Sequence, residues 1–435
     1  MGNPETPDGS AVVISNDAPG SVTAVRSLGQ RGVRTIVASD SDRSPAFTSK
    51  YCDERVRLPS PYDDLLSYRD VLLDLAARPS VKTIVPVREE DVYVLSRYRE
   101  AFAEHLTPVW PTMETLATVH DRLDLFSAAE RAGVTVPETA LLTDVEEWDR
   151  RLIAKGRYGA LTNYYVEEIP PTESWSMPNT QYFEPGDPPD VENLIDRMGH
   201  VPIVQEYVPG TEYTIRALYD EGEALFSTQK ALRRGFKYPR GPSVYHEAVN
   251  IPELREAGLA VLDELEWHGV ASVGFIRDEE TGEFEILEIN PRFWSSLPCD
   301  IHAGVDYPLY YWRLANGDSG PFTPDYRPGT ASHFIRGEIS HLHSVATEQY
   351  PFVEKPSLLR TAAEMVGSMV TQPHFDYLSS NDIRPFVRDT LNAVLEGRDI
   401  GSSRPTTPLS AESRLVDTEA GAEGAERKVN TDRRA

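Results

Sequence analysis

Short apolar segments alternate with helical patterns over the first 115 residues of the chain. Between the first two segments, Val22, Val25 and Leu28 repeat at the spacing of one helix face. A second helical pattern follows the third segment. Strands that alternate with helices in this way predict an α/β fold with a parallel, doubly wound sheet. The segments that predict strands are residues 11–14, 33–38, the start of 81–98, and 106–109.

The turn after the first strand limits what this sheet can bind. Residues 15–21, SNDAPGS, contain one glycine. A dinucleotide site would need the G-x-G-x-x-G fingerprint at this point, because its glycines let the backbone approach the pyrophosphate. We therefore expect a scaffold with a ligand crevice at its strand ends and no NAD site.

The pattern changes after about residue 116. Two helical stretches come first, with Leu116, Val119, Leu123 and Phe126 on one face. Longer alternating segments follow and predict antiparallel strands, which makes this part α+β. A second helix is expected at 254–267, and the proline-rich residues 167–190 predict an inserted or mobile loop. The expected strands are 151–156, 202–208, 212–220, 222–232, 270–278 and 284–290.

These changes of pattern predict four parts of the chain. Residues 1–115 form the parallel-sheet domain, and residues 116–318 form the domain rich in antiparallel strands. Residues 319–400 are expected to pack on that second domain as a C-terminal segment. Residues 401–435 are polar with few large apolar residues, so we expect a disordered tail.

The balance of charge narrows the choice of partners. The net charge is -26, from 69 acidic and 43 basic residues, and only seven of the basic residues are lysines. Such a surface repels phosphate backbones, so no nucleic-acid partner is expected. An acid-rich, lysine-poor composition favours a halophilic protein kept soluble in concentrated salt. A genome that replaces lysine with arginine is the alternative.

Membrane and secretion signals are absent from the sequence pattern. No apolar run reaches about 18 residues, so no membrane partner is expected. The polar N-terminus lacks the apolar core of a signal peptide. Cys52 and Cys299 alone provide neither a disulfide framework nor a zinc cluster, which favours the reducing cytoplasm.

Three polar residues follow one another at the end of the strand predicted at 284–290. Alternation along this strand places Glu288 and Asn290 on the same face. Carboxylate and amide oxygens are hard ligands of the kind Mg²⁺ accepts together with nucleotide phosphates. Arg292 lies just past the strand end and can contact a phosphoryl or carboxylate oxygen through two N–H groups. A strand end that simply meets solvent is the alternative.

Residues 269–297, GVASVGFIRDEETGEFEILEINPRFWSSL, resemble the signature of ATP-grasp ligases of the carbamoyl-phosphate synthetase-like carboxylate–amine type. The resemblance extends over roughly residues 11–390. It implies an ATP-grasp fold preceded by a pre-ATP-grasp Rossmann-like domain. It also implies that Glu288 and Asn290 hold Mg²⁺ (or Mn²⁺) between the ATP phosphates, and that Arg292 assists acyl-phosphate chemistry.

The resemblance assigns nucleotide contacts to further residues. Lys155, which ends the strand at 151–156, would act on the phosphates together with the glycine-containing loop 156–161, and Arg122 would add charge. Residues 202–218 resemble the hinge that reads the adenine edge, and Glu212 stands where the family binds the ribose hydroxyls, as suits a carboxylate acceptor. The implied hinge residues are Gln205, Glu206, Tyr207 and Val208.

A cluster of basic residues stands out in this acidic chain. Concentrated positive charge is costly unless an anion is bound there. The resemblance implies triphosphate and acidic-substrate contacts in this region, and Lys230 and Arg233 are the preferred candidates. A solvated basic loop is the alternative. The cluster comprises Lys230, Arg233, Arg234, Lys237 and Arg240.

Two positions depart from the family pattern. Gly274 stands where the family usually carries an acidic residue or Gln as a metal ligand. Pairing the strands about the turn DEETG predicts that Gly274 lies beside Glu288. Water or another acid, such as Glu247, would then complete the metal shell, or the site is partly degenerate. Arg122 replaces the lysine of a common Asp-Lys pair, which keeps the charge but changes the geometry.

Two functional hypotheses follow. The first is an ATP-dependent ligase that activates a small-molecule carboxylate as an acyl phosphate and joins it to an amine, and that can act as a homodimer. The second is an ATP-binding module that has lost efficient catalysis and serves as a sensor or partner protein. The acceptor pocket is expected between the N-terminal sheet and residues 290–307, with Trp294 and His302 as candidate lining residues.

Overall fold

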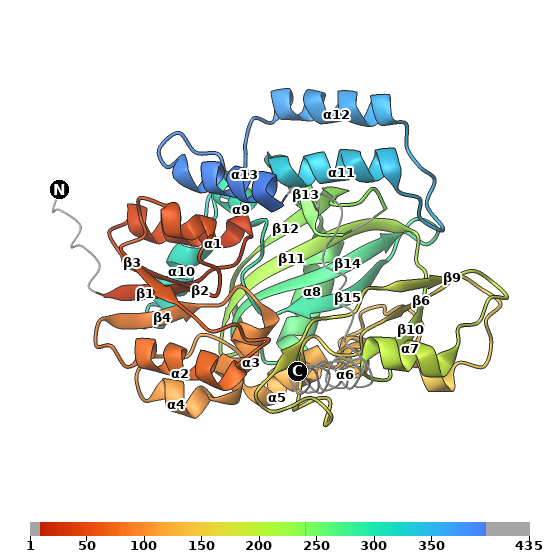
Figure 1. Ribbon diagram of the computed structural model, residues 1–435, viewed down its shortest axis with the longest axis horizontal. Helices are drawn as coiled ribbons and strands as arrows, with labels where there is room; N and C mark the ends of the chain where they lie inside the picture. Colours follow the sequence, from red (N-terminus) through yellow and green to blue (C-terminus); the bar gives the residue numbers. More distant parts are fainter. Residues whose placement is uncertain (1–8, 240, 397–435) are drawn as a thin grey trace, which may run out of the picture.

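A parallel four-stranded sheet opens the chain in the computed structural model, which describes residues 9–239 and 241–396. The strand order is β3-β2-β1-β4, and α1 and α2 lie on opposite sides of the sheet (Figure 1). β1 is completely buried, which explains its continuous apolar sequence. The elements are β1 (Ser10–Ile14), α1 (Pro19–Gln30), β2 (Arg34–Ser39), η1 (Pro45–Thr48), β3 (Glu54–Arg57), α2 (Leu65–Ala76), β4 (Val81–Val85), α3 (Glu89–Arg97) and α4 (Arg99–Ala103).

The sequence pattern misplaced one strand here and missed another. Residues 106–109 form no strand; Leu106 and Val109 are buried in a loop. That loop packs against Gly269, where a Cβ would lie 2.5 Å from the Val109 carbonyl oxygen, so burial alone explains its apolar character. β3 was missed because its residues Glu54–Arg57 alternate between partly exposed and exposed positions at the edge of the sheet.

Two short helices lead into a smaller antiparallel sheet of order β5-β10-β6-β9. The proline-rich insert at 167–190 is anchored at two points, because β8 pairs with β7 and β9 pairs with β6. The elements of this region are α5 (Met113–His120), α6 (Arg122–Arg131), β5 (Thr139–Leu141), η2 (Leu142–Asp144), β6 (Leu152–Lys155), β7 (Leu161–Thr162), β8 (Ser174–Trp175), β9 (Gln181–Phe183), α7 (Val191–Met198) and β10 (Ile203–Glu206).

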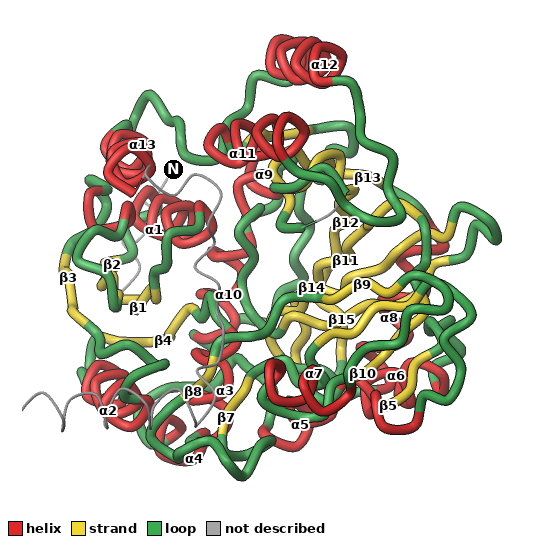
Figure 2. Tube along the Cα trace, turned by 45° about the vertical axis from the view of Figure 1, so that its right-hand side comes forward, coloured by secondary structure: helices red, strands yellow, loops and turns green. Residues whose placement is uncertain are grey.

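A six-stranded antiparallel sheet of order β15-β14-β11-β12-β13-β16 forms the centre of the molecule (Figure 2). Helix α8 covers its back, where an ideal Cβ on Gly258 would overlap Ile215 at 2.1 Å. Alternation leaves the even-numbered residues of β11 on the front. The elements are β11 (Gly210–Asp220), β12 (Glu223–Gly235), β13 (Ser243–Val249), α8 (Pro252–Glu264), β14 (Gly269–Asp278), β15 (Phe284–Asn290) and β16 (Ala331–His333).

Helices after residue 296 connect the two main sheets. The Tyr311 hydroxyl donates to the carbonyl of Ile84 at 3.1 Å, which ties α10 to β4. Gly20 at the start of α1 allows this helix to pack directly on the backbone of Trp294, because a Cβ at Gly20 would lie 2.3 Å from the Trp294 carbonyl oxygen. These helices are α9 (Leu297–His302), α10 (Tyr307–Ala315), α11 (Ile335–Thr347), α12 (Leu358–Thr371) and α13 (Arg384–Glu396).

The C-terminal helices pack on both halves of the molecule. α11 lies against β12 and β13, whereas α13 lies against η1 of the N-terminal region. Asp382, just before α13, accepts from Arg26 and Ser49 at 3.0 and 2.7 Å. Division at residues 115, 318 and 400 therefore remains a proposal, and the tail expected at 401–435 lies outside the described residues.

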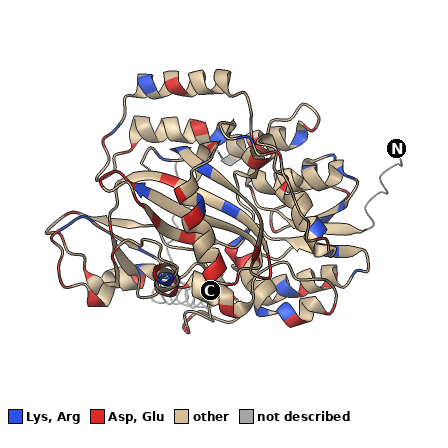
Figure 3. Cartoon of the chain, turned by 180° about the vertical axis from the view of Figure 1, so that it is seen from behind, with Lys and Arg blue, Asp and Glu red and all other residues tan. Residues whose placement is uncertain are grey.

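The outer surface carries acidic residues on its helices. Figure 3, seen from behind, shows Asp and Glu along the outward face of α8, where Glu253, Glu256, Asp263 and Glu264 are exposed. Within the described residues, no helix is both long enough and apolar enough to cross a bilayer.

Candidate functional site

A cleft of about 1760 Å³ lies over the front of the central sheet. It extends from the small sheet at one end to α11 and α13 at the other. Ten of the twelve site residues predicted from sequence line it, and Tyr207 and Arg233 do not. The lining residues among them are Arg122, Lys155, Gln205, Glu206, Val208, Glu212, Lys230, Glu288, Asn290 and Arg292.

Two rows of paired residues cross the sheet floor of this cleft. Lys230 pairs with Thr214, Thr214 with Gly274, and Gly274 with Glu288. This register confirms the hairpin alignment expected for Gly274 and Glu288. The second row runs from Arg216 through Ser272 to Asn290. Paired residues share one face of a sheet, so both rows direct their side chains into the cleft.

Glu288 lies at the centre of a positively charged group. Its carboxylate accepts from Arg122 at 3.2 Å and from the Asn290 amide at 3.0 Å. Although 45% of the side chain is exposed, it lies at the base of a deep cleft. Withdrawal from bulk water raises the pKa of Glu288, but Arg122, Asn290, Lys155 and Arg292 together hold it below its usual value.

Arg292 links the strand end to the N-terminal domain. Its Nη2 donates to the Asn290 amide oxygen at 2.8 Å, and its Nε lies 2.7 Å from a carboxylate oxygen of Glu89. Glu89 is the first residue of α3, where the helix dipole favours a carboxylate. Glu89 also lies 3.3 Å from His120, so Arg292 is positioned from the parallel-sheet side of the cleft.

Arg122 contacts both the metal-ligand candidate and the loop after β6. Beside its contact with Glu288, it donates to the carbonyl of Gly156 at 2.6 Å and to that of Tyr158 at 3.3 Å. A lysine would offer a compact ammonium instead of this planar fork. The Asp-Arg pair in this chain therefore joins the loop 156–161 to the carboxylate of Glu288.

Two backbone amides of the loop 156–161 are hydrogen-bonded within the protein. The amide of Arg157 donates to the Nε2 of His200 at 3.0 Å, and that of Gly159 donates to the His120 carbonyl at 2.7 Å. Burial lowers the pKa of His200 to about 4, so its Nε2 is a neutral acceptor. Lys155 remains directed to the cleft, beside the ring of Phe126.

The hinge predicted at 205–208 has two of its amides in use. The amide of Glu206 donates to the Glu138 carbonyl and that of Tyr207 to the Arg151 carbonyl. An adenine contact through these two residues would have to use their carbonyl oxygens. The Gln205 side chain donates to Thr139 at 2.9 Å, and the Tyr207 ring packs on Phe352 outside the cleft.

Lys230 is a buried cation on the cleft floor. Its exposed fraction is 8%, and its side chain forms no ion pair with a carboxylate of the described chain. Burial lowers the pKa of Lys230 to about 7, and the nearby Arg216 lowers it further, against smaller opposing effects of Cys299, Glu212 and Asp300. A cation in this position favours a bound anion.

Arg233 lies outside the cleft, contrary to expectation. Side chains alternate along a strand, so Lys230 and Leu232 face the cleft and Arg233 faces the other way. Arg233 pairs with Glu247 at 2.8 Å. Glu247 also lies outside the cleft, so it is not the acid that replaces the missing ligand at Gly274.

The rest of the basic cluster is divided between structural and cleft positions. Arg234 donates through two nitrogens to Glu338 of α11, each at 2.8 Å, and is therefore a structural cation. Lys237 lines the cleft and lies 3.7 Å from Glu348. Arg240 lies outside the described residues.

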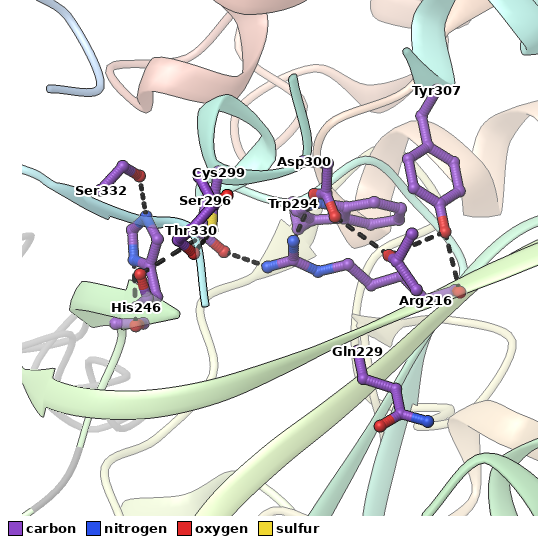
Figure 4. A network of polar contacts seen from close by, with 12 residues as sticks. Arg216, Gln229, His246, Trp294, Ser296, Cys299, Asp300, Tyr307, Thr330 and Ser332 are labelled. Atoms are coloured by element: carbon purple, nitrogen blue, oxygen red, sulfur yellow. Dashed lines mark hydrogen bonds and ion pairs between the residues drawn. The ribbon is translucent and has the colours of Figure 1, made fainter. Parts of the chain in front are cut away.

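The acceptor region contains a network that sequence reasoning missed (Figure 4). Arg216 is 1% exposed; it donates to Asp300 and Ser296, and its guanidinium lies over the Trp294 ring, 4.9 Å from the ring centre. Asp300 also accepts from Trp294 at 2.7 Å. Trp294 lines the cleft as expected, whereas His302 stacks on His374 away from it. The one available signal was a charged residue within the apolar strand YTIRAL.

Comparison with known proteins gives a partial sequence match. Residues 200–333 match a family model described as ATP-grasp in the biosynthetic pathway with Ter operon. The chain is 30% identical over 136 residues to a D-alanine–D-alanine ligase of Acidiphilium cryptum (strain JF-5). That match covers 28% of this chain and 44% of the ligase, so the chain aligns with less than half the length of that relative.

Solved structures share the fold over most of the chain. The L-amino acid ligase from Bacillus licheniformis has a TM-score of 0.55 at 15% identity, covering 75% of this chain and 79% of its own. The biotin carboxylase domain of 2-oxoglutarate carboxylase from Hydrogenobacter thermophilus, solved with MgADP, ADP and bicarbonate, has a TM-score of 0.57 at 17% identity. That likeness covers 75% of this chain and 74% of the other.

The segment matched by the family model is the one that forms the central sheet of the shared fold. Residues 200–333 include all six strands of the central sheet, with Glu288 and Asn290 on β15. The expected ATP-grasp fold, with a parallel sheet before the antiparallel ones, is confirmed. The chain therefore has the ATP-grasp fold, and its residues 200–333 match an ATP-grasp family model.

Proposed function

We propose that this protein is an ATP-dependent carboxylate–amine ligase. The observation that carries the proposal is the convergence of Glu288, Asn290, Arg292, Lys155 and Arg122 around one point of the cleft. A hard carboxylate–amide pair surrounded by cations suits a nucleotide triphosphate and its metal. The likeness to ATP-grasp ligases supports the same reaction class.

The reaction has two transfers. A carboxylate oxygen of the substrate attacks the γ-phosphorus of ATP, the bond to the β,γ-bridging oxygen breaks, and ADP leaves. The amine nitrogen then attacks the carbonyl carbon of the acyl phosphate, the carbon–oxygen bond breaks, and inorganic phosphate leaves. The amine loses one proton to solvent or a nearby base. Catalysis in such transfers is mainly positioning and stabilisation of charge.

The residues fit a magnesium ion only when the nucleotide supplies further ligands. Within the described chain, no group of three or more His, Cys, Asp or Glu residues forms a metal cluster. Glu288 and Asn290 would hold the ion, which would neutralise phosphate charge. Three cations, Arg122, Lys155 and Arg292, surround Glu288. They disfavour the bare ion, so we expect Mg²⁺ (or Mn²⁺) to bind together with ATP.

The remaining residues are assigned by their place in the cleft. Lys155 contacts the phosphates, Glu212 accepts from the ribose hydroxyls, and residues 205–208 border the adenine. Arg292, fixed by Glu89 and Asn290, donates to the carboxylate or to the acyl phosphate formed from it. Arg122 would exchange its contact with Glu288 for a phosphate oxygen when Mg²⁺·ATP binds.

The direct test is ADP release by the full chain with Mg²⁺·ATP. Purified protein is incubated with a panel of carboxylic acids and amines in molar KCl, and ADP, phosphate and the amide product are measured. Release of ADP that depends on both substrates, with equal amounts of phosphate and amide, supports the ligase. ADP release that needs no amine, or none at all across the panel, overturns it.

A catalytically degenerate ATP-binding protein is the second candidate, and Gly274 favours it. The position faces Glu288 and provides no ligand. A Cβ added to Gly274 would meet its nearest neighbour, the Glu288 Cγ, at 3.5 Å, an ordinary contact distance. Space is therefore available for an acid that this chain lacks. Tight Mg²⁺·ATP binding without turnover would identify this alternative.

A homodimer through α12 completes the proposal. Leu359, Val366 and Val370 form a stripe on this helix and are 84%, 58% and 74% exposed. The helix carries one arginine and one glutamate, so it is neutral in a chain of net charge -26. A second copy can pair there without charge repulsion, and Val370→Glu should convert a dimer measured by light scattering into a monomer. A wild-type monomer would overturn the assembly.

A further inference from the structure

The end of the cleft opposite the hinge is formed by helices that lie outside the family match. α11 and α13 both follow residue 333, where that match ends. Apolar side chains of both helices line the cleft, and two of them, Ile339 and Val394, are 55% and 71% exposed. An ion pair of 3.2 Å between Arg336 and Asp389 holds the two helices together. The cleft therefore has an apolar wall, formed by Ile335, Ile339, Phe386 and Val394.

The floor of the same cleft is cationic. The Lys230 side chain is more than nine-tenths buried and lines the cleft, and no carboxylate of the described chain forms an ion pair with it. Arg216 lies on the adjacent strand, held by Asp300 and Ser296, and its Nε is buried without a hydrogen-bond partner. Because Arg216 is already paired with the carboxylate of Asp300, Lys230 is the positive charge left without a paired carboxylate. An uncompensated buried cation is costly, which favours an anionic ligand.

The cationic floor is distinct from the metal-ligand pair. Thr214 and Gly274 separate Lys230 from Glu288 across the sheet. Three strand spacings amount to about 14 Å between the backbones of Lys230 and Glu288. The acids at this end are paired elsewhere, Asp389 with Arg336 and Glu348 with Lys237. An anion at Lys230 would therefore meet little competition from neighbouring carboxylates.

We propose that the apolar wall of α11 and α13 and the floor of Lys230 and Arg216 form a subsite for a carboxylic acid with a bulky apolar body. The Lys230 ammonium binds the carboxylate beside the positive charge of the buried Arg216, and Ile335, Ile339, Phe386 and Val394 contact the apolar part. The subsite rests on the proposed ligase function, for which it names the class of acid. A small acid such as acetate would leave the wall exposed to water and bind weakly.

The test measures binding of three probes to the full chain by calorimetry in the presence of Mg²⁺·ADP. The probes are propanoate, 4-methylpentanoate and 4-methylpentanamide. The longer acid should bind about tenfold more tightly than propanoate, because three further carbons become buried against the wall. It should also bind about tenfold more tightly than the amide, because only the acid pairs with Lys230. Equal affinity for all three probes would overturn the subsite.

Variants assign each preference to its residues. Ile339→Asp and Val394→Asp should remove the preference for the longer acid, and Lys230→Met should remove the preference for acid over amide. Val191→Asp, at the 37% exposed first residue of α7 and outside the cleft, is the matched control and should change neither. An Ile339→Asp protein that behaves like the control would refute the wall. Loss of ADP affinity in Lys230→Met, with the preference for acid intact, would assign Lys230 to the nucleotide instead.

The subsite and the ligase fail in different ways. If no acid and amine pair releases ADP while the binding preferences persist, the ligase proposal fails and the subsite stands. If ADP is released but propanoate and 4-methylpentanoate react with equal kcat/KM, the ligase stands and the subsite fails.

Discussion

The two ends of the cleft differ in how clearly the sequence pattern predicts their functional residues. At the end that we propose binds the nucleotide (the nucleotide end), Glu288, Asn290 and Arg292 stand within five positions at one strand end. Their side-chain types favour a site for a metal ion and phosphates. At the opposite end, the wall comes from two amphipathic helices whose apolar residues resemble those of any core. A site for a metal ion and phosphates needs particular polar atoms, whereas an apolar wall needs only apolar volume. The residues of the first end can therefore be predicted from the sequence, and those of the second cannot.

The largest effect expected at the nucleotide end is that of Glu288→Gln. This change removes the carboxylate that we propose holds Mg²⁺ and also the anion that balances Arg122, Lys155 and Arg292. We expect ATP turnover to fall at least 100-fold, about 2.7 kcal/mol of transition-state stabilisation. ADP release and a melting curve check this result. Retained turnover in a folded protein would mean that Glu288 is not part of the nucleotide site. The sequence would then predict that end of the cleft no better than the opposite end.

Gly20→Ala tests the contact between the N-terminal sheet and the acceptor end. The added Cβ would lie 2.3 Å from the Trp294 carbonyl oxygen, so the backbone must move. Forced rearrangement of this kind costs about 1–3 kcal/mol, and the melting temperature should fall by a few degrees. Gly133→Ala is no control because its φ is positive. Gly367→Ala on α12 is the matched control, because a Cβ there meets nothing within 4 Å.

The pH dependence of acid binding tests the positive charge that we propose at the end of the cleft opposite the nucleotide end. Lys230, with a pKa of about 7 in the folded protein, is protonated below that value and loses its charge as the pH rises through it. Affinity for 4-methylpentanoate should therefore fall above about pH 7, by up to tenfold per pH unit. The groups that face Lys230 are Arg216, Cys299, Glu212 and Asp300, and buried His246 lies near it.

Lys230→Arg separates this titration from any other, because arginine keeps its charge throughout the accessible range. Its affinity profile should be flat between pH 6 and about pH 9, at a level set by the altered geometry. The same falling profile in Lys230→Arg would assign the titration to a different group. The calorimetric measurement is repeated at each pH with both proteins.

Gly274→Asp should have a smaller effect, confined to the metal. The new carboxylate would face Glu288 on the paired strand, and the 3.5 Å contact of its Cβ is tolerated. We expect the Mg²⁺ concentration for half-maximal ATP binding to fall several-fold with a normal melting curve. An unchanged magnesium requirement would mean that the metal lies elsewhere than beside Glu288. Gly274→Ser, which adds bulk without charge, is the control.

The smallest effect concerns the whole surface. If the excess of acid reflects adaptation to salt, raising KCl from 0.1 M to 1 M should raise the melting temperature through screening of the repulsion. Sodium and potassium chloride should act alike. A flat response would attribute the composition to replacement of lysine by arginine in the genome, and the charge of the cleft would then be its only functional electrostatic feature.

Much of the fold was predictable because local rules decide it. The alternation of apolar runs and helices predicted the parallel sheet, and the turn DEETG predicted the register that pairs Gly274 with Glu288. β3 and the loop at 106–109 were misjudged, because burial by distant segments overrides local pattern. Arg233 was wrongly placed in the cleft although simple alternation from Lys230 points it away.

The sequence by itself determined the ATP-grasp fold, the residues of the proposed nucleotide end and the pairing of Gly274 with Glu288. The motifs that support these predictions are short, and residues that are neighbours in the chain are also neighbours in the site. Only the tertiary structure decided that Arg122 contacts Glu288, that Asp300 and Ser296 hold Arg216, and that α11 and α13 form the opposite wall. Those contacts join residues more than 50 positions apart, and no periodicity along the chain indicates which distant surfaces will pack together.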